Sequence, residues 1–323
     1  MSKAVLTFDY ELFLGDDTGT AECSILQPTA AILKLLKKYN AKAIFFVDAT
    51  YLLVLKKYNS KDFISISKQL REIMASNSSV ELHLHPQWLD AVPNGERWSF
   101  KSFEHYRLHS LHKERIGTLF KEGVSVLEDI TGKKVQAFRA GGWSITPFQV
   151  LKDAFIENGI VLDMSVCPGF YKDALPMHYY DFRKAPGQAY YRFSDDVCSI
   201  DSNGMFLEIP VTTYEMSGVD LAINTIFKRF KNDPIYGDGK GLASANVRGN
   251  ILKRLMQKNL RKATIEGQSN YFFQKSLKKL KDRALLSYVM HPKTINQEAL
   301  ANMEYLLQHY RTLNSDDLLK EYF

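Results

Sequence analysis

Short apolar runs rich in β-branched and aromatic residues alternate along the chain with longer segments of helical period. The apolar runs predict seven strands, at residues 4–11, 41–48, 80–85, 135–140, 161–166, 205–211 and 285–291. Helices are predicted at 28–39, 113–131 and 147–158. This alternation is typical of βα units around a parallel sheet, and seven strands predict a barrel one strand short of eight.

Two stretches interrupt the alternation. Residues 170–204 hold several tyrosines among turn residues, which indicates irregular structure or hairpins laid over one face. Residues 213–284 have a largely helical and basic pattern that includes the runs KRLMQKNLRK and KSLKKLKDR. We therefore expect one α/β domain spanning residues 1–323, a distorted seven-stranded (β/α) barrel with hairpin and helical insertions at 170–204 and 213–284.

The composition fits a globular protein, because 45% of the 323 residues are hydrophobic and 24% are charged. The net charge of +6 is mild for this length and gives no indication of nucleic acid as a partner. The basic runs indicate solvated helix faces or, as the alternative, peripheral contact with a membrane or an anionic substrate. The stretch IYGDGKGL lacks the residue order of a phosphate-binding loop.

The cysteine pattern and the absence of targeting signals bear on the compartment. Cys23, Cys167 and Cys198 lie far apart without the spacing of a metal finger, so reduced, structural thiols are expected. The sequence shows no secretory signal and no run of about 18 apolar residues, which predicts a cytoplasmic protein.

Ionisable residues gather at the carboxyl ends of predicted strands, which meet at one mouth in a parallel barrel. Asp9 and Glu11 lie two apart in FDYELF and share one strand face, and His83 and His85 do the same in ELHLHPQW. Carboxylates and imidazoles together suit zinc or a neighbouring first-row cation, with positions left for water and substrate. Helix capping or ordinary hydrogen bonding is the alternative role for each of them alone.

Two further strand ends carry cationic side chains. Arg139 emerges in FRAGGW beside a glycine pair that permits a tight turn, and it either pairs with Asp163 or contacts substrate. His291 ends the last strand in LSYVMHP, where a histidine can protonate a leaving group or serve the structure.

The ordered set TFDYE, HLHPQW, FRAGGW, LDMSV and VMHP resembles the polysaccharide deacetylase superfamily, carbohydrate esterase family 4, with its NodB-homology domain. HLHPQW and FRAGGW are similar to a divergent bacterial subgroup with an HxHPxW motif, associated with surface polysaccharide biosynthesis. The resemblance runs from residue 4 to residue 291. It implies the same distorted seven-stranded barrel, a divalent metal, usually zinc, and hydrolysis of N-acetyl or O-acetyl groups on a sugar polymer or its precursor.

The first motif implies two roles. Asp9 matches the aspartate that acts as general base in the family. Tyr10 stands where the family has a metal-binding aspartate, so Glu11 becomes the candidate metal ligand.

The second motif implies the remaining ligands. His85 matches the first histidine of the family pattern, whereas the second histidine falls on Leu89. His83, which shares a strand face with His85, is the candidate replacement, and the amide oxygen of Gln87 is the alternative.

The later motifs imply supporting roles. Arg139 matches the arginine that orients the base, Asp163 resembles an acid that supports the site, and His291 matches the proposed general acid. Trp88, Trp143 and the tyrosines of 171–191 suit a platform for pyranose rings, with core packing as the alternative role.

A metal-dependent deacetylase acting on an acetylated carbohydrate is therefore the expected function. One alternative is a metal-independent amidase, or a glycosidase that uses Asp9 and Glu11, on the same scaffold. Another is a carbohydrate-binding protein that has lost catalysis, since the second-motif histidine is missing. Nucleic-acid binding through the basic segment 251–283 is not expected, because no recognised module accompanies the charge.

Overall fold

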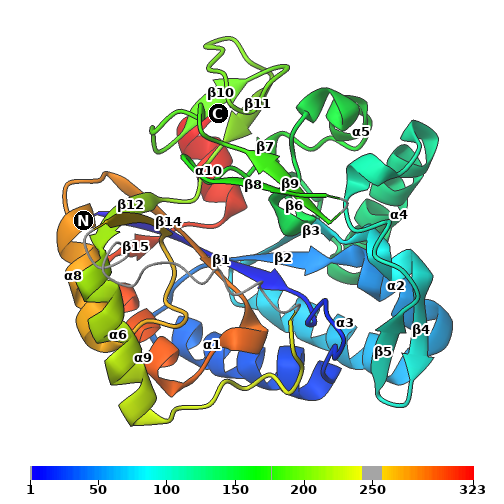
Figure 1. Ribbon diagram of the computed structural model, residues 1–323. Helices are drawn as coiled ribbons and strands as arrows, with labels where there is room; N and C mark the ends of the chain where they lie inside the picture. Colours follow the sequence, from blue (N-terminus) through cyan, green and yellow to red (C-terminus); the bar gives the residue numbers. More distant parts are fainter. Residues whose placement is uncertain (1, 176, 242–256) are drawn as a thin grey trace.

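The computed structural model describes residues 2–175, 177–241 and 257–323 (Figure 1). Its central sheet consists of β1 (Lys3–Tyr10), β2 (Ile44–Asp48), β3 (Ser79–Leu84), β6 (Ala137–Ala140), β7 (Leu162–Asp163), β10 (Tyr191–Phe193), β11 (Phe206–Glu208), β14 (Leu285–Met290) and β15 (Arg311–Thr312). The strand order is β10-β11-β7-β6-β3-β2-β1-β14, with β15 also beside β1.

Each of the seven predicted strands overlaps a strand of this sheet, and these seven pair in parallel. β10 adds an antiparallel edge. In the described part of the chain no ladder joins β11 to β14, so an open, curled sheet of nine strands stands where a distorted barrel of seven was expected. A backbone hydrogen bond from Thr212 N to Ser287 O, 3.0 Å long, links the segments where a barrel would close.

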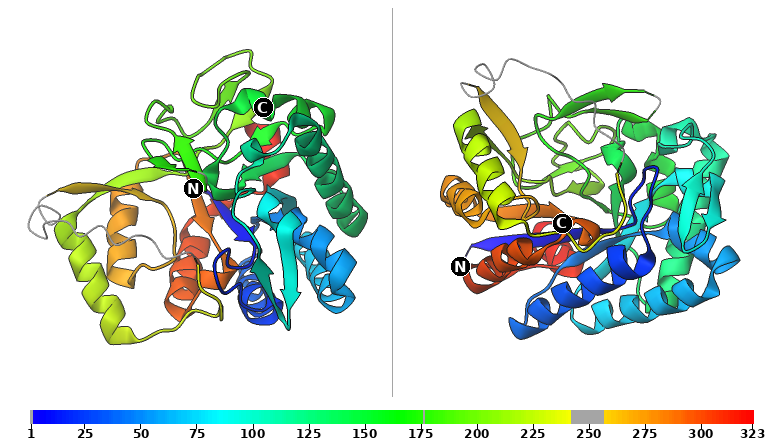
Figure 2. Two further views of the ribbon diagram at one scale, coloured as in Figure 1. Left: turned by 45° about the vertical axis from the view of Figure 1, so that its right-hand side comes forward. Right: turned by 60° about the horizontal axis from the view of Figure 1, so that its bottom comes forward.

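Nine α-helices are described around the sheet: α1 (Gln27–Lys38), α2 (Ala49–Tyr58), α3 (Ser60–Ala75), α4 (Lys113–Thr131), α5 (Lys152–Glu157), α6 (Gly218–Lys231), α8 (Asn270–Leu280), α9 (Gln297–His309) and α10 (Ser315–Tyr322). The helix predicted at 113–131 is α4, and the one predicted at 28–39 is α1 shifted by one residue. The third prediction is divided between a 3-10 turn, Phe148–Val150, and α5. The helices cover the outside of the sheet (Figure 2).

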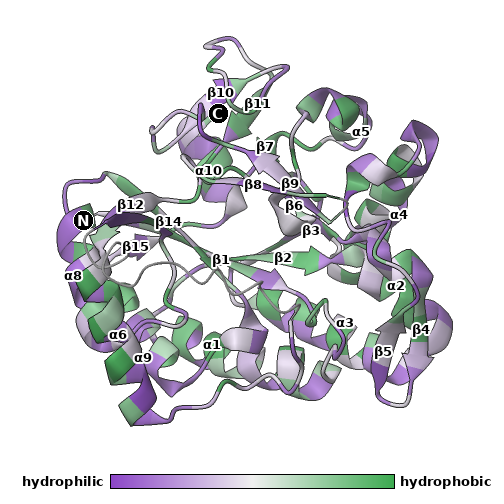
Figure 3. Cartoon of the chain, in the orientation of Figure 1, coloured by the Kyte–Doolittle hydropathy of each residue, from purple (hydrophilic) through white to green (hydrophobic). Residues whose placement is uncertain are grey.

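Alternation along the strands separates two layers of core. Leu6 and Phe8 of β1 face the helices, and Phe8 stacks on Phe45 with ring centroids 5.0 Å apart. Val5 and Phe46 belong to a smaller cluster on the opposite, inner face. The helices carry hydrophobic and hydrophilic residues in alternating patches, as expected for helices with one buried side (Figure 3). Since side chains two apart share a face, the inner layer leads directly to the polar strand ends.

The insertion at 170–204 matches its prediction more closely than the insertion at 213–284 does. Residues 170–204 contain the predicted hairpin, β8 (Tyr171–Ala174) with β9 (His178–Asp181). The second insertion holds α6 and α8 but also an unpredicted antiparallel pair, β12 (Thr213–Ser217) with β13 (Lys258–Lys262). A further short hairpin joins β4 (Ala91–Asn94) to β5 (Arg97–Phe100).

The basic runs and the cysteines are placed only in part. Residues 242–256, with the beginning of the KRLMQKNLRK run, lie outside the described residues. The run KSLKKLKDR falls on and after α8, where Lys278 and Lys279 are exposed. All three cysteines are free thiols. Among the described residues, no helix has both the length and the apolar character needed to cross a bilayer.

Candidate metal and catalytic site

Three predicted ligands meet where β1 and β3 end. Nε2 of His85 lies 2.8 Å from Oε2 of Glu11, and Nε2 of His83 lies 3.1 Å from the same oxygen. One ligand atom from each of these buried side chains lies within 4.8 Å of the others. The structure therefore brings together the set Glu11, His83 and His85 that the sequence predicted as metal ligands.

The ring of His83 is oriented for coordination. Its Nδ1 lies 2.8 Å from the carbonyl oxygen of Arg139, and because a carbonyl only accepts, Nδ1 carries a proton and donates it. Nε2 is thereby directed at Glu11. Burial opposes a charge on this imidazole, yet the hydrogen bond to Glu11 and the nearby carboxylates outweigh burial and raise the pKa of His83 to about 9. A cation between the three side chains would take the place of that proton.

The position of His85 depends on a glycine. A Cβ on Gly141 would lie 2.4 Å from the carbonyl oxygen of Leu84 and 2.8 Å from the imidazole of His85. Gly141 of FRAGGW thus makes room for the imidazole of His85. Nδ1 of His85 is buried and has no hydrogen-bond partner among the described residues.

Lys293 is a buried cation beside the ligands that the sequence reasoning missed. Its Nζ donates to Oε1 of Glu11 at 2.8 Å and to the carbonyl oxygen of Leu12 at 2.7 Å. Burial alone would raise the pKa of Glu11, but Lys293 and the two imidazoles hold it well below its usual value. Glu11 is thus ionised, with Oε1 engaged by the ammonium and Oε2 left to face the histidines.

Asp9 is held as a carboxylate by Arg139. Nη1 of Arg139 donates to Oδ1 of Asp9 at 2.6 Å and to Oγ1 of Thr7 at 2.7 Å, while Nε donates to the carbonyl oxygen of Met164 at 2.9 Å. Burial pushes the pKa of Asp9 upward, and the guanidinium together with two histidines lowers it below its ordinary value. Arg139 therefore pairs with Asp9, and not with Asp163 as the sequence allowed.

His291 faces Asp9 from the end of β14. Its Nε2 lies 3.6 Å from Oδ2 of Asp9, and its Nδ1 lies 3.2 Å from Oε1 of Glu266, which also accepts a hydrogen bond from the backbone N–H of His291. Glu266 thus fixes the ring from behind. It follows β13, in a segment where the sequence predicted no strand end, so no pattern pointed to it.

Asp163 lies apart from these groups. It is fully buried and accepts hydrogen bonds from Oγ and N of Ser165, at 2.7 and 3.1 Å. Oγ of Ser165 in turn accepts from the backbone N–H of Ala140 at 2.9 Å. Burial raises the pKa of both Asp163 and the neighbouring Glu208. Asp163 therefore supports the backbone at the end of β6 without reaching the ligands.

A cavity of about 400 Å³ opens over the site. Its lining combines the charged groups above with aromatic and small residues, namely Asp9, Glu11, Phe13, Leu14, His83, His85, Tyr106, Ala140, Gly142, Trp143, His178, Gly241, Glu266, His291, Lys293 and Thr294. Asp163 and Gln87 are outside it. Trp88 is fully buried against Tyr51 and Phe100, so it belongs to the core, whereas Trp143 lies at the mouth.

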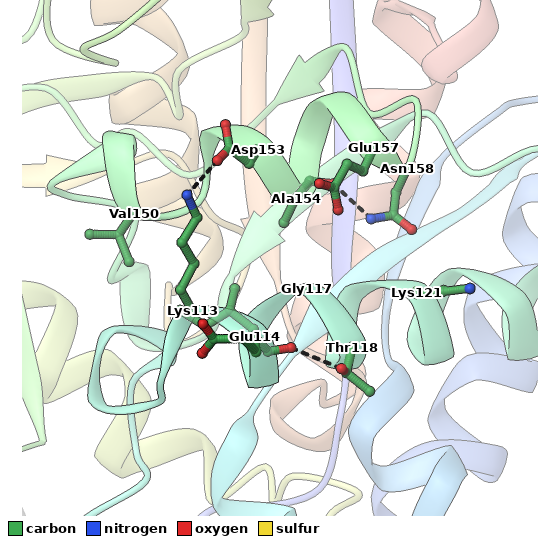
Figure 4. Close-up of a pocket in the computed structure, with 11 residues that line it drawn as sticks. Lys113, Glu114, Gly117, Thr118, Lys121, Val150, Asp153, Ala154, Glu157 and Asn158 are labelled. Atoms are coloured by element: carbon green, nitrogen blue, oxygen red, sulfur yellow. Dashed lines mark hydrogen bonds and ion pairs between the residues drawn. The ribbon is translucent and has the colours of Figure 1, made fainter.

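A larger cavity, of about 780 Å³, lies elsewhere, between α4 and α5 (Figure 4). Among its charged side chains, Lys113 pairs with Asp153 at 2.6 Å. It contains none of the residues at the strand ends. The smaller cavity is therefore the candidate site, because it alone of the two joins ionised carboxylates to converging imidazoles.

Comparison with known proteins agrees with this geometry. Residues 2–154 match the family model for polysaccharide deacetylases. Among solved structures, the chain is similar to one assigned as a polysaccharide deacetylase, from Mycobacterium smegmatis, with a TM-score of 0.50 and 12% identity over 99% of this chain and 89% of that one. The 4-α-glucanotransferase of Thermococcus litoralis gives a TM-score of 0.52 and 9% identity, over 99% of this chain and 38% of that one. At identities this low, the likeness of the chain to each of these structures shows a shared fold and nothing more. No curated protein matches the chain.

Proposed function

We propose that the chain is a metal-dependent hydrolase of the polysaccharide deacetylase family, whose family model matches residues 2–154. The reaction is removal of an N-acetyl or O-acetyl group from a bacterial surface polysaccharide or from its sugar precursor. The observation that carries the proposal is the convergence of Glu11, His83 and His85 on one point beside the ionised Asp9.

The donor set fits a divalent cation. Two imidazole Nε2 atoms and one carboxylate oxygen are ligands that zinc prefers, and we propose zinc. Bound by Glu11, His83 and His85, the ion would supply Lewis-acid polarisation of the acyl carbonyl and lower the pKa of water at the site.

Side chains of the protein accept and donate the protons of the reaction. Asp9 accepts a proton from the attacking water, and Arg139 keeps its carboxylate ionised and aimed. For an N-acetyl substrate, a C–O bond forms to the water oxygen and the C–N bond breaks. His291, turned toward the cavity by Glu266, delivers a proton to the departing amine, and acetate is the second product.

Lys293 supports one competing function. Its ammonium already contacts Glu11, at 2.8 Å, and supplies positive charge beside the ligand set. A metal-independent amidase on this scaffold would use that charge to stabilise the developing oxyanion. Metal content and chelation separate the two, because activity that persists in metal-free protein would favour the competing function.

The test pairs acetate release with metal binding on the purified full chain. Acetate release is followed with N-acetylated and O-acetylated oligosaccharides, and zinc binding is followed by calorimetry. Asp9→Asn is expected to lower acetate release at least a hundredfold while zinc still binds, since Asp9 is not a ligand. His83→Ala is expected to weaken zinc binding at least tenfold.

Asp16→Asn is the matched control, because Asp16 is an exposed aspartate near the same strand. It should keep both properties. Full acetate release by Asp9→Asn would remove the proposed base, and wild-type zinc affinity in His83→Ala would remove the proposed ligand set.

A further inference from the structure

A second, small hollow adjoins the candidate site. It has a volume of about 60 Å³ and is lined by Trp143, Cys167, Phe170, Tyr180 and Lys262. Trp143 lines both this hollow and the main cavity. The hollow has the volume of about two water molecules, which is enough for one small substituent but not for a sugar ring.

Shared elements make the hollow an extension of the site. His178 lines the main cavity and Tyr180 lines the hollow, and because they lie two apart on β9 they share one face of that strand. Lys262 ends β13, and Glu266, four residues later, reaches His291 in the main cavity. A ligand in the main cavity therefore has the hollow immediately beside it.

Lys262 differs from the other charged groups of this region. Each carboxylate of the main cavity already has a nitrogen partner: Asp9 faces the guanidinium of Arg139, Glu11 the ammonium of Lys293 and Glu266 the imidazole of His291. Among the described residues, Lys262 has no carboxylate within 4.0 Å. Its Nζ lies instead 4.9 Å from the centroid of the Trp143 ring. The guanidinium carbon of Arg139 lies 5.7 Å from the same centroid. The indole of Trp143 therefore has two cations near it, Lys262 and Arg139.

We propose that Lys262 and the hollow bind an anionic substituent, a carboxylate or a phosphate, that the substrate carries beside its acetylated sugar. The acetylated part of this statement rests on the proposed function, whereas the anion site does not. An ammonium that is half-buried among three aromatic rings gains more from an anion than an ammonium in water would, because the effective dielectric constant is lower there. The substrate class inferred is therefore an acidic, acetylated saccharide.

Trp143 provides a direct readout that does not depend on turnover. The emission of the purified full chain is followed during titration with glucuronate, glucose 6-phosphate and neutral glucose, at ionic strength held constant with sodium chloride. Trp143→Phe identifies the part of the signal that comes from this indole, since Trp88 and Trp98 are buried in the core. At least one acidic sugar should give a saturable change with at least tenfold higher affinity than glucose, and the two acids distinguish carboxylate from phosphate.

Variants of one strand provide the decisive comparison. Lys262→Met should lower the affinity for the acidic sugar at least tenfold, and Lys262→Arg should largely retain it. Lys258→Met is the matched control, because Lys258 lies on the same strand, is exposed, and pairs with Glu215 at 3.3 Å. Equal affinity for acidic and neutral sugars, no saturable response, or wild-type affinity in Lys262→Met would each overturn the proposal.

Failure of the two proposals can be told apart. Asp9→Asn should keep the response to the acidic sugar while acetate release is lost. A response that depends on Lys262 in a protein that releases no acetate from any substrate would leave the anion site standing and remove the deacetylase. Acetate release without that response would do the reverse.

Discussion

The buried carboxyl group of Glu81 allows a quantitative test of how β3, β6 and α10 pack against one another. Glu81 is 2% exposed, and it accepts hydrogen bonds from the backbone N–H groups of Gln136 and Ala137, both at 2.9 Å, and from the hydroxyl of Ser315 at the start of α10. Burial is the largest influence and raises the pKa of Glu81 to about 7, although these donors oppose it. The group therefore links the ionisation of one side chain to the junction of β3, β6 and α10.

The sign follows from the direction of the shift. The folded protein holds the proton more tightly than the unfolded chain, so stability is highest below pH 4.5 and is lost as the pH rises through 7. The pKa rises by about 2.5 units from its ordinary value of 4.5. At 1.36 kcal/mol per unit, ionisation of Glu81 lowers the free energy of unfolding by about 3 kcal/mol at pH 8.5 relative to pH 4.5.

Glu81→Gln removes this ionisation but keeps an oxygen for the two backbone donors. Urea denaturation at pH 4.5 and pH 8.5 measures the free energy of unfolding of both proteins. Between pH 4.5 and pH 8.5, the free energy of unfolding of the wild type should fall by about 3 kcal/mol relative to that of the variant. Glu114→Gln, which changes an exposed glutamate of α4, should follow the wild type. A difference below about 1 kcal/mol for Glu81→Gln would refute the assignment of a buried, perturbed carboxyl group.

Three further substitutions test the site and the core. Gly141→Ala should weaken zinc binding at least tenfold by displacing His85, measured by calorimetry, and unchanged affinity would contradict the close approach. Glu266→Gln should lower kcat and leave KM nearly unchanged, with zinc still bound, because the ring of His291 is no longer held in place. Wild-type kcat and KM in this variant would exclude a positioning role for Glu266. Phe138→Ala should cost about 3–5 kcal/mol in urea denaturation, since this ring is fully buried, and a cost below about 1 kcal/mol would contradict its packing.

The strands of the sheet were predictable because central parallel strands are buried on both faces and form continuous apolar runs. Residues 44–48 and 285–290 are buried throughout, and both lie inside predicted strands. Whether the curled sheet closes into a barrel was not predictable in the same way. It depends on hydrogen bonds between segments such as those of Thr212 and Ser287, and an apolar pattern carries no information on which edges meet.

The convergence of Glu11, His83 and His85 was predictable from spacing, since residues two apart share a strand face. Lys293 could not be found in this way, because it lies in the 3-10 turn Pro292–Thr294 that follows β14. Glu266 had no such signal, because its position depends on the antiparallel pair of β12 and β13. The residues alone left the partner of Arg139 open, whereas the family resemblance, which makes Arg139 the residue that orients Asp9, agrees with the contact that the guanidinium makes across the inner face from β6 to β1.

The pairing of β14 with β1 has a consequence for the newly made chain. One edge of β1 pairs with β2, which lies about 40 positions further along the chain, but its other edge meets β14, whose residues are made about 280 positions later. Until then, the backbone N–H and C=O groups of an apolar strand remain available to other chains on the ribosome. This delay makes residues 3–10 the segment where aggregation during translation should begin, and a chaperone that binds there would protect the whole molecule.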